Sequence, residues 1–406
     1  MNKETLITIR KNIMNELPDN TVTFLFSGLP VRKSADAEYP FFANRNFFYG
    51  THIEEPGAIL VFDKPNQKEI LFLRDIDAFK EKWIGHYMRD TEAFERCGVE
   101  DIRYFSAFDD YVGEVIKAGY KIGVDMDHDT IADEYYGSGL MFSEEFDEDF
   151  VTDIFENIVK CRMVKLPEEV EAIKAAAEVT NTAIMSMIEE MKPGNNENDM
   201  AARFLYEGNR AHGDLMFDTI VASGKNATTL HYISNDQPLN DGELVLLDLG
   251  IRVNGYGADI SRTFPINGKY TQRQRDVYQE VLNCFHAINE AIKPGVSILD
   301  LNELSKELLG KSCIKLGLID SVEEVGQYYY HSIGHSLGLD THDVWLDRAT
   351  PLVVGNVITN EPGLYIAEES IGIRIETDVV VTENGCVDLA PQIIREVDAI
   401  EKTMLK

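Results

Sequence analysis

The sequence predicts an α/β domain followed by an α+β domain built from two related halves. Short strand-like and helix-like segments alternate in the first part of the chain, which is typical of α/β folds. The second part repeats one order of elements: an amphipathic helix, a Lys-Pro-Gly sequence, another helix, a histidine-containing segment and a hairpin with two carboxylates. We place the domain boundary after an acidic run, with domains at residues 1–155 and 160–406.

In the first domain, four segments have the short, β-rich pattern of strands. The stretch 77–86 has the pattern of a helix. The predicted strands are 21–26, 58–62, 69–73 and 121–124.

The second domain begins with a long predicted helix. Pro167 suits its first turn, and apolar residues recur at helical spacing as far as Met191. The sequence Lys192-Pro193-Gly194, which ends this helix, returns as Lys293-Pro294-Gly295 in front of a further helix. A match this short also arises by chance, but the repeated order of elements favours duplication. A site between two such halves would collect ligands from both.

The composition is that of a globular protein. Of the 406 residues, 44% are hydrophobic and 27% are charged, which excludes a disordered or collagen-like chain. No apolar run approaches the roughly 20 residues of a membrane span, and the first residues lack the apolar core of a secretory signal. We therefore expect a cytoplasmic protein.

The chain is strongly acidic, with 38 Lys and Arg against 70 Asp and Glu and a formal net charge of −32. This charge argues against binding to nucleic acid or to anionic membranes, and we interpret it as a source of solubility. The five cysteines are scattered and form no C-x-x-C pair. We expect free thiols in a reducing compartment and no cysteine-based metal site.

The first hairpin carries two aspartates on one face. Asn254-Gly255 between two β-rich runs is a strong hairpin signal, and a two-residue turn there places Asp248 opposite Ser261. Asp259 then lies opposite Gly250, diagonal to Asp248 and on the same face. A lone buried Asp is satisfied by backbone amides, whereas neighbouring carboxylates repel each other unless a cation lies between them. The pair therefore favours a metal site.

The second hairpin has a charged face. Alternation along residues 371–378 places three isoleucines on one face and Arg374, Glu376 and Asp378 on the other. An exposed edge strand with an ordinary salt bridge has the same pattern. Residues 379–381 are apolar on both faces, however, which favours a buried strand. A charged face on a buried strand indicates a polar cavity.

Three of the nine histidines fall within twelve residues between the hairpins: His331, His335 and His342. A lone histidine is usually structural, but three interleaved with glycines, which let backbone and ligand approach closely, favour a site. An oxygen-rich ligand set with one or two imidazoles suits Mn, Co, Fe or Zn, although Zn usually has more nitrogen or sulfur ligands. The chain has no H-E-x-x-H, G-x-S-x-G or glycine-rich phosphate loop.

These residues stand in motifs that resemble those of the pita-bread metallopeptidases, the family of methionine aminopeptidase, aminopeptidase P and prolidase. The resemblance covers residues 160–406. It implies a pita-bread fold with an internal pseudo-two-fold axis and a metal site with the ligands Asp248, Asp259, His335, Glu361 and Glu376. The matching segments are Leu247-Asp-Leu-Gly, Ala258-Asp-Ile-Ser-Arg-Thr-Phe, His331-x-x-Gly-His, Asn360-Glu-Pro-Gly-Leu-Tyr and Arg374-Ile-Glu-Thr-Asp.

The resemblance also implies a role for each ligand. Asp248 would bind one divalent ion, and His335 and Glu361 would bind the other. Asp259 and Glu376 would bridge the two ions. Such a pair supplies hydroxide near neutral pH and polarises the scissile carbonyl. Glu361 would also be the general base.

Further residues gain implied roles toward the substrate. His231 and His342 would be catalytic residues that hold the substrate carbonyl and the tetrahedral intermediate. His331 would line a pocket for proline. Tyr365 and Arg374 would orient the metal ligands.

The first domain resembles the N-terminal domain of aminopeptidase P and creatinase. Residues 32–49 carry this resemblance, and Trp83-Ile-Gly is similar to a Trp-Phe-Gly whose Trp reaches the active site of a neighbouring subunit. It implies that Trp83 binds substrate and that the protein is a homodimer or homotetramer. Phe217 departs from the family pattern, because many members have Tyr there. The departure puts in doubt a hydroxyl bond to Asp248.

We therefore expect a dinuclear metallopeptidase that releases the N-terminal residue from Xaa-Pro peptides. The expected cofactors are two divalent ions, Mn in the first place, with Co or Zn as alternatives. Peptides are the only partners expected besides further copies of the chain.

Three alternatives remain open from the sequence. A prolidase would cleave Xaa-Pro dipeptides and would hold their carboxylate with a cation. Residues 334–343 contain no Lys or Arg, and we expect Arg374 to be engaged by Glu376 or Asp378. A creatinase-like amidinohydrolase works without metal and has no need of all five ligands. A non-enzymatic pita-bread module that binds a protein partner would typically have lost ligands.

Overall fold

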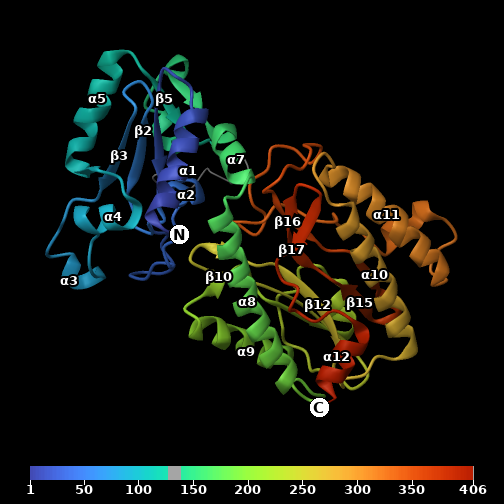
Figure 1. The fold of residues 1–406 in the computed structure, drawn as a ribbon. Helices are drawn as coiled ribbons and strands as arrows, with labels where there is room; N and C mark the ends of the chain where they lie inside the picture. The colour runs from blue at the N-terminus through green and yellow to red at the C-terminus, as the bar shows by residue number, and fades with distance from the viewer. Residues whose placement is uncertain (127–138, 406) are drawn as a thin grey trace. The chain divides into compact units, whose positions relative to one another are not determined.

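The computed structural model describes residues 1–126 and 139–405. The chain divides into two compact units, Met1–Arg162 and Met163–Lys406. Both contain helices and strands (Figure 1). None of the helices in the described ranges combines the length and the apolar character that a membrane span requires.

The first unit contains a six-stranded mixed sheet in the order β4-β3-β2-β1-β5-β6. Strand β1 pairs antiparallel with β2 and parallel with β5. The apolar side chains of the sheet form a core with those of α5. This core includes the fully buried Phe24 and Phe72. The strands are β1 (Thr21–Phe26), β2 (Ile59–Asp63), β3 (Lys68–Leu73), β4 (Asp101–Tyr104), β5 (Lys121–Val124) and β6 (Val151–Asp153).

All four strands predicted for this unit are present, with ends within one residue of those expected. The helix predicted over 77–86 is confirmed only in part, since α3 is a single turn. The Asp77 carboxylate accepts hydrogen bonds from the backbone N–H groups of Phe79 and Lys80, and Gly85 ends the turn at a φ of 95°. The helices are α1 (Lys3–Glu16), α2 (Arg45–Thr51), α3 (Glu81–Ile84), α4 (Asp90–Cys97), α5 (Phe108–Ala118), α6 (Gly139–Ser143) and α7 (Phe155–Met163).

In the second unit, short antiparallel strands lie between helices α8 and α9 and helices α10 and α11 (Figure 1). The long helix predicted from Pro167 is confirmed as α8. The helices are α8 (Pro167–Glu190), α9 (Glu197–Arg210), α10 (Gln272–Ala291), α11 (Ile298–Lys315) and α12 (Val397–Met404). The strands are β7 (Asp214–Leu215), β8 (Ile220–Ser223), β9 (Leu244–Leu249), β10 (Ile251–Val253), β11 (Tyr256–Gly257), β12 (Ile260–Pro265), β13 (Val357–Asn360), β14 (Gly363–Ile366), β15 (Ile371–Arg374), β16 (Thr377–Thr382) and β17 (Gly385–Asp388).

The two halves of this unit repeat individual hydrogen bonds as well as elements. After α8, Gly194 at φ 92° donates its backbone N–H to the carbonyl of Leu239 at 2.9 Å. After α10, Gly295 at φ 90° donates in the same way to Leu352, also at 2.9 Å. Only glycine adopts such backbone angles without strain. The repeated geometry confirms the predicted duplication.

Candidate active site

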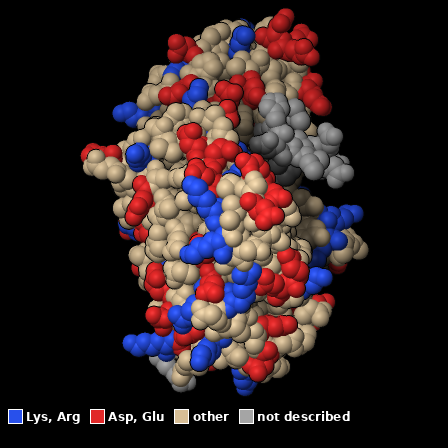
Figure 2. Space-filling view, turned by 90° about the vertical axis from the view of Figure 1, so that its right-hand side faces the viewer, with Lys and Arg blue, Asp and Glu red and all other residues tan. Residues whose placement is uncertain are grey.

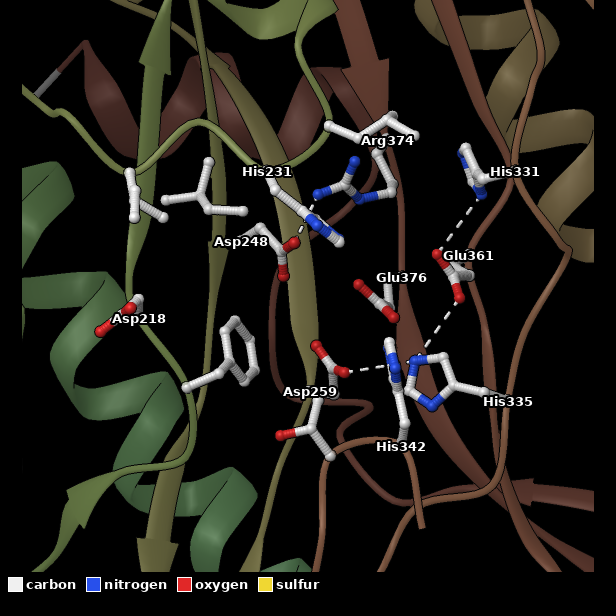
Figure 3. Close-up of a pocket in the computed structure, with 15 residues that line it drawn as sticks. Asp218, His231, Asp248, Asp259, His331, His335, His342, Glu361, Arg374 and Glu376 are labelled. Carbon is white, nitrogen blue, oxygen red and sulfur yellow. Dashed lines mark hydrogen bonds and ion pairs between the residues drawn. The ribbon is translucent and has the colours of Figure 1, made fainter. Parts of the chain in front are cut away.

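One cavity in the second unit gathers charged side chains from both halves (Figure 3). Its volume is about 420 Å³. Ten titratable side chains line it together with an apolar wall and one threonine. The lining residues are Phe217, Asp218, Ile220, Leu230, His231, Ile233, Asp248, Asp259, His331, His335, Thr341, His342, Glu361, Arg374 and Glu376.

The first half contributes its two aspartates through the hairpin of β9 and β12. Asp248 pairs with Ser261, so the predicted register is confirmed. The two strands of this hairpin approach closely at Gly250. A Cβ there would lie 1.8 Å from the carbonyl oxygen of Ala258, so the position requires glycine. Asp259 is 4% exposed and directly precedes β12. The two carboxylates therefore enter the cavity from adjacent strands.

The second half contributes His335 and Glu361 through a paired segment. The backbone N–H of His335 donates to Thr359 Oγ1 at 3.0 Å, and the Thr359 N–H donates to the His335 carbonyl at 2.9 Å. A Cβ at Gly334 would lie 2.2 Å from the Thr359 carbonyl oxygen, so a glycine is required for this approach. The close approach expected of the glycines between the histidines is confirmed at this position.

His335 points one ring nitrogen at the carboxylates. Its Nδ1 lies 3.0 Å from the Ser336 carbonyl oxygen, which only accepts, so Nδ1 carries the proton. Its Nε2 lies 3.4 Å from Asp259 Oδ2 and 3.6 Å from Glu361 Oε1. Asp259, His335 and Glu376 offer ligand atoms within 4.8 Å of one another. Fixing the far nitrogen by a backbone carbonyl is how proteins orient a metal-binding imidazole.

The electrostatics of the cavity fit a cation. Burial raises the pKa of Asp248 to about 6, against the opposing charge of Arg374. Burial also raises the pKa of Glu361 to about 7, and it raises that of Glu376 further above its usual range, with the charge of Asp259 adding to the shift. Neighbouring buried carboxylates resist ionisation unless a positive charge is present.

Two further observations agree with a divalent ion at this place. Asp248 Oδ1 is buried and accepts no hydrogen bond from the described residues. Burial would lower the pKa of His335, but its hydrogen bond to Asp259 and the charge of Glu361 raise that pKa to about 9. A set of metal ligands made of carboxylates and one imidazole suits Mn, Co or Zn.

Arg374 holds several parts of the site together from β15. Its Nη2 donates to Asp248 Oδ2 at 2.5 Å, and its Nε donates to Ser261 Oγ at 2.6 Å. Ser261 Oγ in turn donates to Glu376 Oε2 at 2.6 Å. One guanidinium thus fixes carboxylates from both halves, directly or through a hydroxyl.

The expected partners of Arg374 were wrong, since it contacts Asp248 rather than Glu376 or Asp378. Asp378 instead accepts the backbone N–H of Asp259 at 3.2 Å. The charged face predicted for residues 371–378 is nevertheless buried, with Arg374, Glu376 and Asp378 at most 4% exposed. The exposed edge strand is therefore excluded.

His331 and Tyr365 extend the network on the Glu361 side. His331 Nδ1 lies 2.7 Å from the Ser332 carbonyl, so its Nε2 accepts the Tyr365 hydroxyl at 2.8 Å. The same hydroxyl oxygen accepts Arg374 Nη1 at 2.9 Å. Burial, followed by the charge of Arg374, lowers the pKa of His331 to about 3. This histidine is therefore neutral.

His231 and His342 complete the polar side of the cavity. The ring of His342 lies 4.3 Å from that of His335, centroid to centroid, and His231 lies on an exposed loop after β8. Burial and the charge of His335 lower the pKa of His342. Both residues lie where the sequence analysis expected substrate contacts, and their roles stay predictions.

Two predicted site residues, Tyr365 and Trp83, do not line this cavity. Tyr365 contacts it through its bonds to the lining residues His331 and Arg374. Trp83 lies on α3 of the first unit, with 78% of its side chain exposed. Its role at a neighbouring subunit stays a prediction.

Several residues that contribute to the site were not predicted from the sequence. Ser261 and Thr359 carry hydroxyls that hold ligands, and the hairpin register places Ser261 directly opposite Asp248. The pairing with Asp248 could have indicated Ser261 from the sequence, whereas no local sequence feature indicated Thr359. Asp218 and the apolar residues Ile220, Leu230 and Ile233 were also not predicted, whereas Phe217 was predicted only as a position that lacks a hydroxyl.

Comparison with known proteins gives the family. A sequence profile of metallopeptidase family M24 matches residues 171–383, and one of the aminopeptidase P N-terminal domain matches residues 7–122. The Xaa-Pro aminopeptidase of Escherichia coli K12 is 33% identical over 98% of this chain and 96% of its own length. Human Xaa-Pro aminopeptidase 3 is 30% identical over 95% of this chain and 80% of its own.

Solved structures agree over the full chain. A Bacillus anthracis protein superposes with a TM-score of 0.96 at 39% identity, covering 100% of this chain and 99% of its own. Zn-substituted E. coli aminopeptidase P in complex with product superposes with a TM-score of 0.91 at 30% identity, covering 100% and 98%. The chain therefore belongs to metallopeptidase family M24, as a metal-dependent enzyme of the aminopeptidase P type with a pita-bread catalytic fold.

Proposed function

We propose that the enzyme releases the first residue from peptides whose second residue is proline, with two divalent ions as cofactors. The observation that carries this proposal is the convergence of five carboxylates and four histidines on one cavity with an apolar wall. The names of its relatives, Xaa-Pro aminopeptidases from bacteria and mammals, support the same substrate class. Because the chain is an enzyme, the non-enzymatic binding module is set aside.

The metal ligands we propose are those implied by the sequence. Asp248 would hold one ion, His335 and Glu361 would hold the other, and Asp259 and Glu376 would contribute to holding both. Two divalent ions held there would supply an activated water near neutral pH and would polarise the scissile carbonyl. Manganese is our first candidate because the ligand set is rich in oxygen.

The side chains of the chain itself supply the proton transfer. Glu361, whose carboxylate lies in the cavity within 3.6 Å of His335 Nε2, is suited to take a proton from the attacking water and to return it to the leaving nitrogen. His231 and His342 line the same cavity and would hold the substrate carbonyl as negative charge develops on its oxygen. His331 would line the proline pocket.

Proline suits this cavity for a chemical reason. Its nitrogen carries no hydrogen once it is part of a peptide bond. Where other peptides offer the enzyme a backbone N–H donor, an Xaa-Pro peptide offers the apolar surface of the proline ring. Phe217, Ile220, Leu230 and Ile233 provide an apolar wall. A pocket formed for a ring rejects other residues by shape.

A prolidase is the second candidate, and the charges of the cavity argue against it. Among the described lining residues, Arg374 is the single Lys or Arg, and its guanidinium is bound to Asp248, Ser261 and Tyr365. No lining cation is therefore available for the carboxylate of a dipeptide. We infer that the substrate chain continues beyond proline.

Two further properties belong to this proposal. We propose a homodimer or homotetramer, in which Trp83 reaches a neighbouring active site. None of the five cysteines, all in described parts of the chain, forms a disulfide, which supports a reducing compartment such as the cytoplasm.

The test combines metal removal with peptide length. The purified protein is chelated, dialysed and assayed with Xaa-Pro-Yaa and Xaa-Pro peptides after separate addition of Mn, Co or Zn. We expect cleavage of Xaa-Pro-Yaa after its first residue, lost on chelation and restored best by Mn or Co. Full activity of the metal-free protein would overturn the metal mechanism. Hydrolysis of dipeptides without tripeptides would identify a prolidase.

A further inference from the structure

Glu197 is a buried carboxylate outside the catalytic cavity with an unusual number of donors. It is the first residue of α9 and is 0% exposed. Its Oε1 accepts from Ser223 N and Ser223 Oγ, both at 2.7 Å, and from Asn226 Nδ2 at 3.1 Å. Its Oε2 accepts from Tyr232 Oη at 2.7 Å and from the backbone N–H of Gln237 at 3.0 Å.

These donors all belong to one segment, residues 223–237, which we call the His231 loop. Ser223 begins the loop, Gln237 ends it, and Tyr232 directly follows His231 along the chain. Between them the loop presents Leu230, His231 and Ile233 to the cavity. Glu197 therefore ties together both ends and the centre of the loop that forms one wall of the site.

Only a carboxylate satisfies this set of donors. An ionised carboxylate is acceptor-only, whereas a glutamine amide of the same shape presents two donors on one side. In Glu197→Gln, that NH₂ group would face either Ser223 and Asn226 or Tyr232 and Gln237. A buried donor facing a donor is strongly unfavourable, so part of the loop would move.

We propose that Glu197 is a positioning residue that sets the place of His231 for catalysis. This inference rests on the proposed function, in which His231 holds the substrate carbonyl. It predicts that Glu197 acts on kcat through His231 and not through the metal ligands, none of which is among the residues that donate to its carboxylate.

The test is a double-mutant cycle on the Mn-loaded, full-length enzyme with an Xaa-Pro-Yaa peptide. Wild type, Glu197→Gln, His231→Ala and the double variant are compared for kcat, KM and metal content. We expect Glu197→Gln to lower kcat between about 10-fold and 100-fold, the size of effect of a misplaced catalytic group. In the His231→Ala background it should change kcat less than about twofold. Metal content should stay that of the wild type.

Glu207→Gln is the matched control. Glu207 lies on the same helix and is also buried, but its carboxylate pairs with Arg203, Arg210 and Ser186. We expect it to leave kcat and KM unchanged. A loss of activity in Glu207→Gln equal to that in Glu197→Gln would overturn the proposal, because it would show a general effect of α9.

A second variant keeps the test independent of folding. The His231 loop retains its bond from Val221 N to Asn235 Oδ1 at 2.8 Å, so Glu197→Gln is expected to fold. Tyr232→Phe removes only the hydroxyl beside His231 and should lower kcat in the same His231-dependent way.

An equal loss of kcat in the wild-type and His231→Ala backgrounds, or a parallel loss of metal, would overturn the inference. A wild type inactive on Xaa-Pro-Yaa would overturn the proposed function instead.

Discussion

Glu361 illustrates how one buried side chain acquires a chemical role from its surroundings. Burial raises its pKa to about 7, and its carboxylate lies 3.6 Å from His335 Nε2 and 3.5 Å from His331 Nδ1. Divalent ions bound beside it would hold this carboxylate ionised, so that it could accept a proton from water. The same group is thus suited to metal binding and to proton transfer.

The first prediction concerns this residue. Glu361→Gln preserves the shape of the side chain but removes its charge and basicity. We expect kcat for an Xaa-Pro-Yaa peptide to fall by about 10²-fold to 10⁴-fold. Glu383→Gln, an exposed exchange of the same kind, is the control and should leave turnover unchanged. Near-normal turnover of Glu361→Gln would show that the site is misplaced.

The second prediction concerns Asp248, whose Oδ2 accepts Arg374 Nη2 while its Oδ1 lacks a partner among the described residues. Asp248→Asn removes the negative charge that we expect to hold one of the ions. Metal content per chain, measured by mass spectrometry of the metal, should fall. Retention of two ions per chain at wild-type affinity would contradict the ligand assignment.

At the scale of elements, the site depends on how closely the His335 segment approaches β13. A Cβ at Gly334 would lie 2.2 Å from the Thr359 carbonyl oxygen, while a Cβ at Gly326 would meet nothing within 4 Å. We predict that Gly334→Ala lowers the free energy of unfolding by about 1–3 kcal/mol and weakens metal binding, because His335 must move. Gly326→Ala should change neither. Equal behaviour of the two variants in denaturant titration would refute this reading of the segment.

The end of α2 gives a pH-dependent prediction for the first unit. His52 caps this helix at φ 52° and is 5% exposed. Burial, followed by the charges of the N-terminus and nearby arginines, lowers its pKa to about 3. Because its pKa in the unfolded chain is about 6.5, the unfolded state binds the extra proton between pH 6.5 and 3. Stability therefore falls as the pH falls through this window.

His52→Asn removes this titration while Asn still tolerates the left-handed conformation. Below pH 6.5 we expect the wild type to lose about 1.4 kcal/mol per pH unit more than the variant, measured by urea unfolding. His212→Asn is the control, since His212 has a φ of 56° but is exposed. A pH dependence shared by the wild type and His52→Asn would rule out His52 as the cause.

At the scale of the whole molecule, the surface charge bears on solubility, and the exposed apolar side chains bear on contacts with other molecules. Acidic side chains are spread over the face drawn in Figure 2, with Lys and Arg between them. This distribution agrees with our interpretation of the net charge of −32 as a source of solubility. Against this polar background, Trp83 with 78% of its side chain exposed is conspicuous, because large exposed apolar groups often mark contact sites.

The last prediction tests whether Trp83 serves a neighbouring subunit. Trp83→Ala should lower kcat/KM more for longer Xaa-Pro peptides than for dipeptides, because only a longer chain would reach a residue from another subunit. Ile116→Ala, an exposed apolar residue of the same unit, is the control. The oligomeric state is measured in parallel by light scattering. A monomer with full activity on longer peptides would remove the assigned role.

The sequence by itself determined many of the elements and which residues gather at the cavity. The Asn254-Gly255 turn fixed the pairing of Asp248 with Ser261, because a two-residue turn leaves one register. Alternation separated Arg374 and Glu376, which line the cavity, from the isoleucines beside them, although the run divides between β15 and β16. The repeated Lys-Pro-Gly sequences revealed the two halves. These features follow from rules that act over a few residues, so they are visible without the fold.

Tertiary structure alone decided the partners of those residues. Arg374 binds Asp248 rather than its near neighbours Glu376 and Asp378, because strands remote in sequence bring a better-placed acceptor into its reach. The five-donor environment of Glu197 likewise depends on a loop that begins 26 residues further along the chain. In 77–86, the helix is limited to the single turn of α3, because Gly85 ends it at a φ of 95°. Periodicity specifies faces, whereas the choice of partner depends on which faces the packed fold brings together.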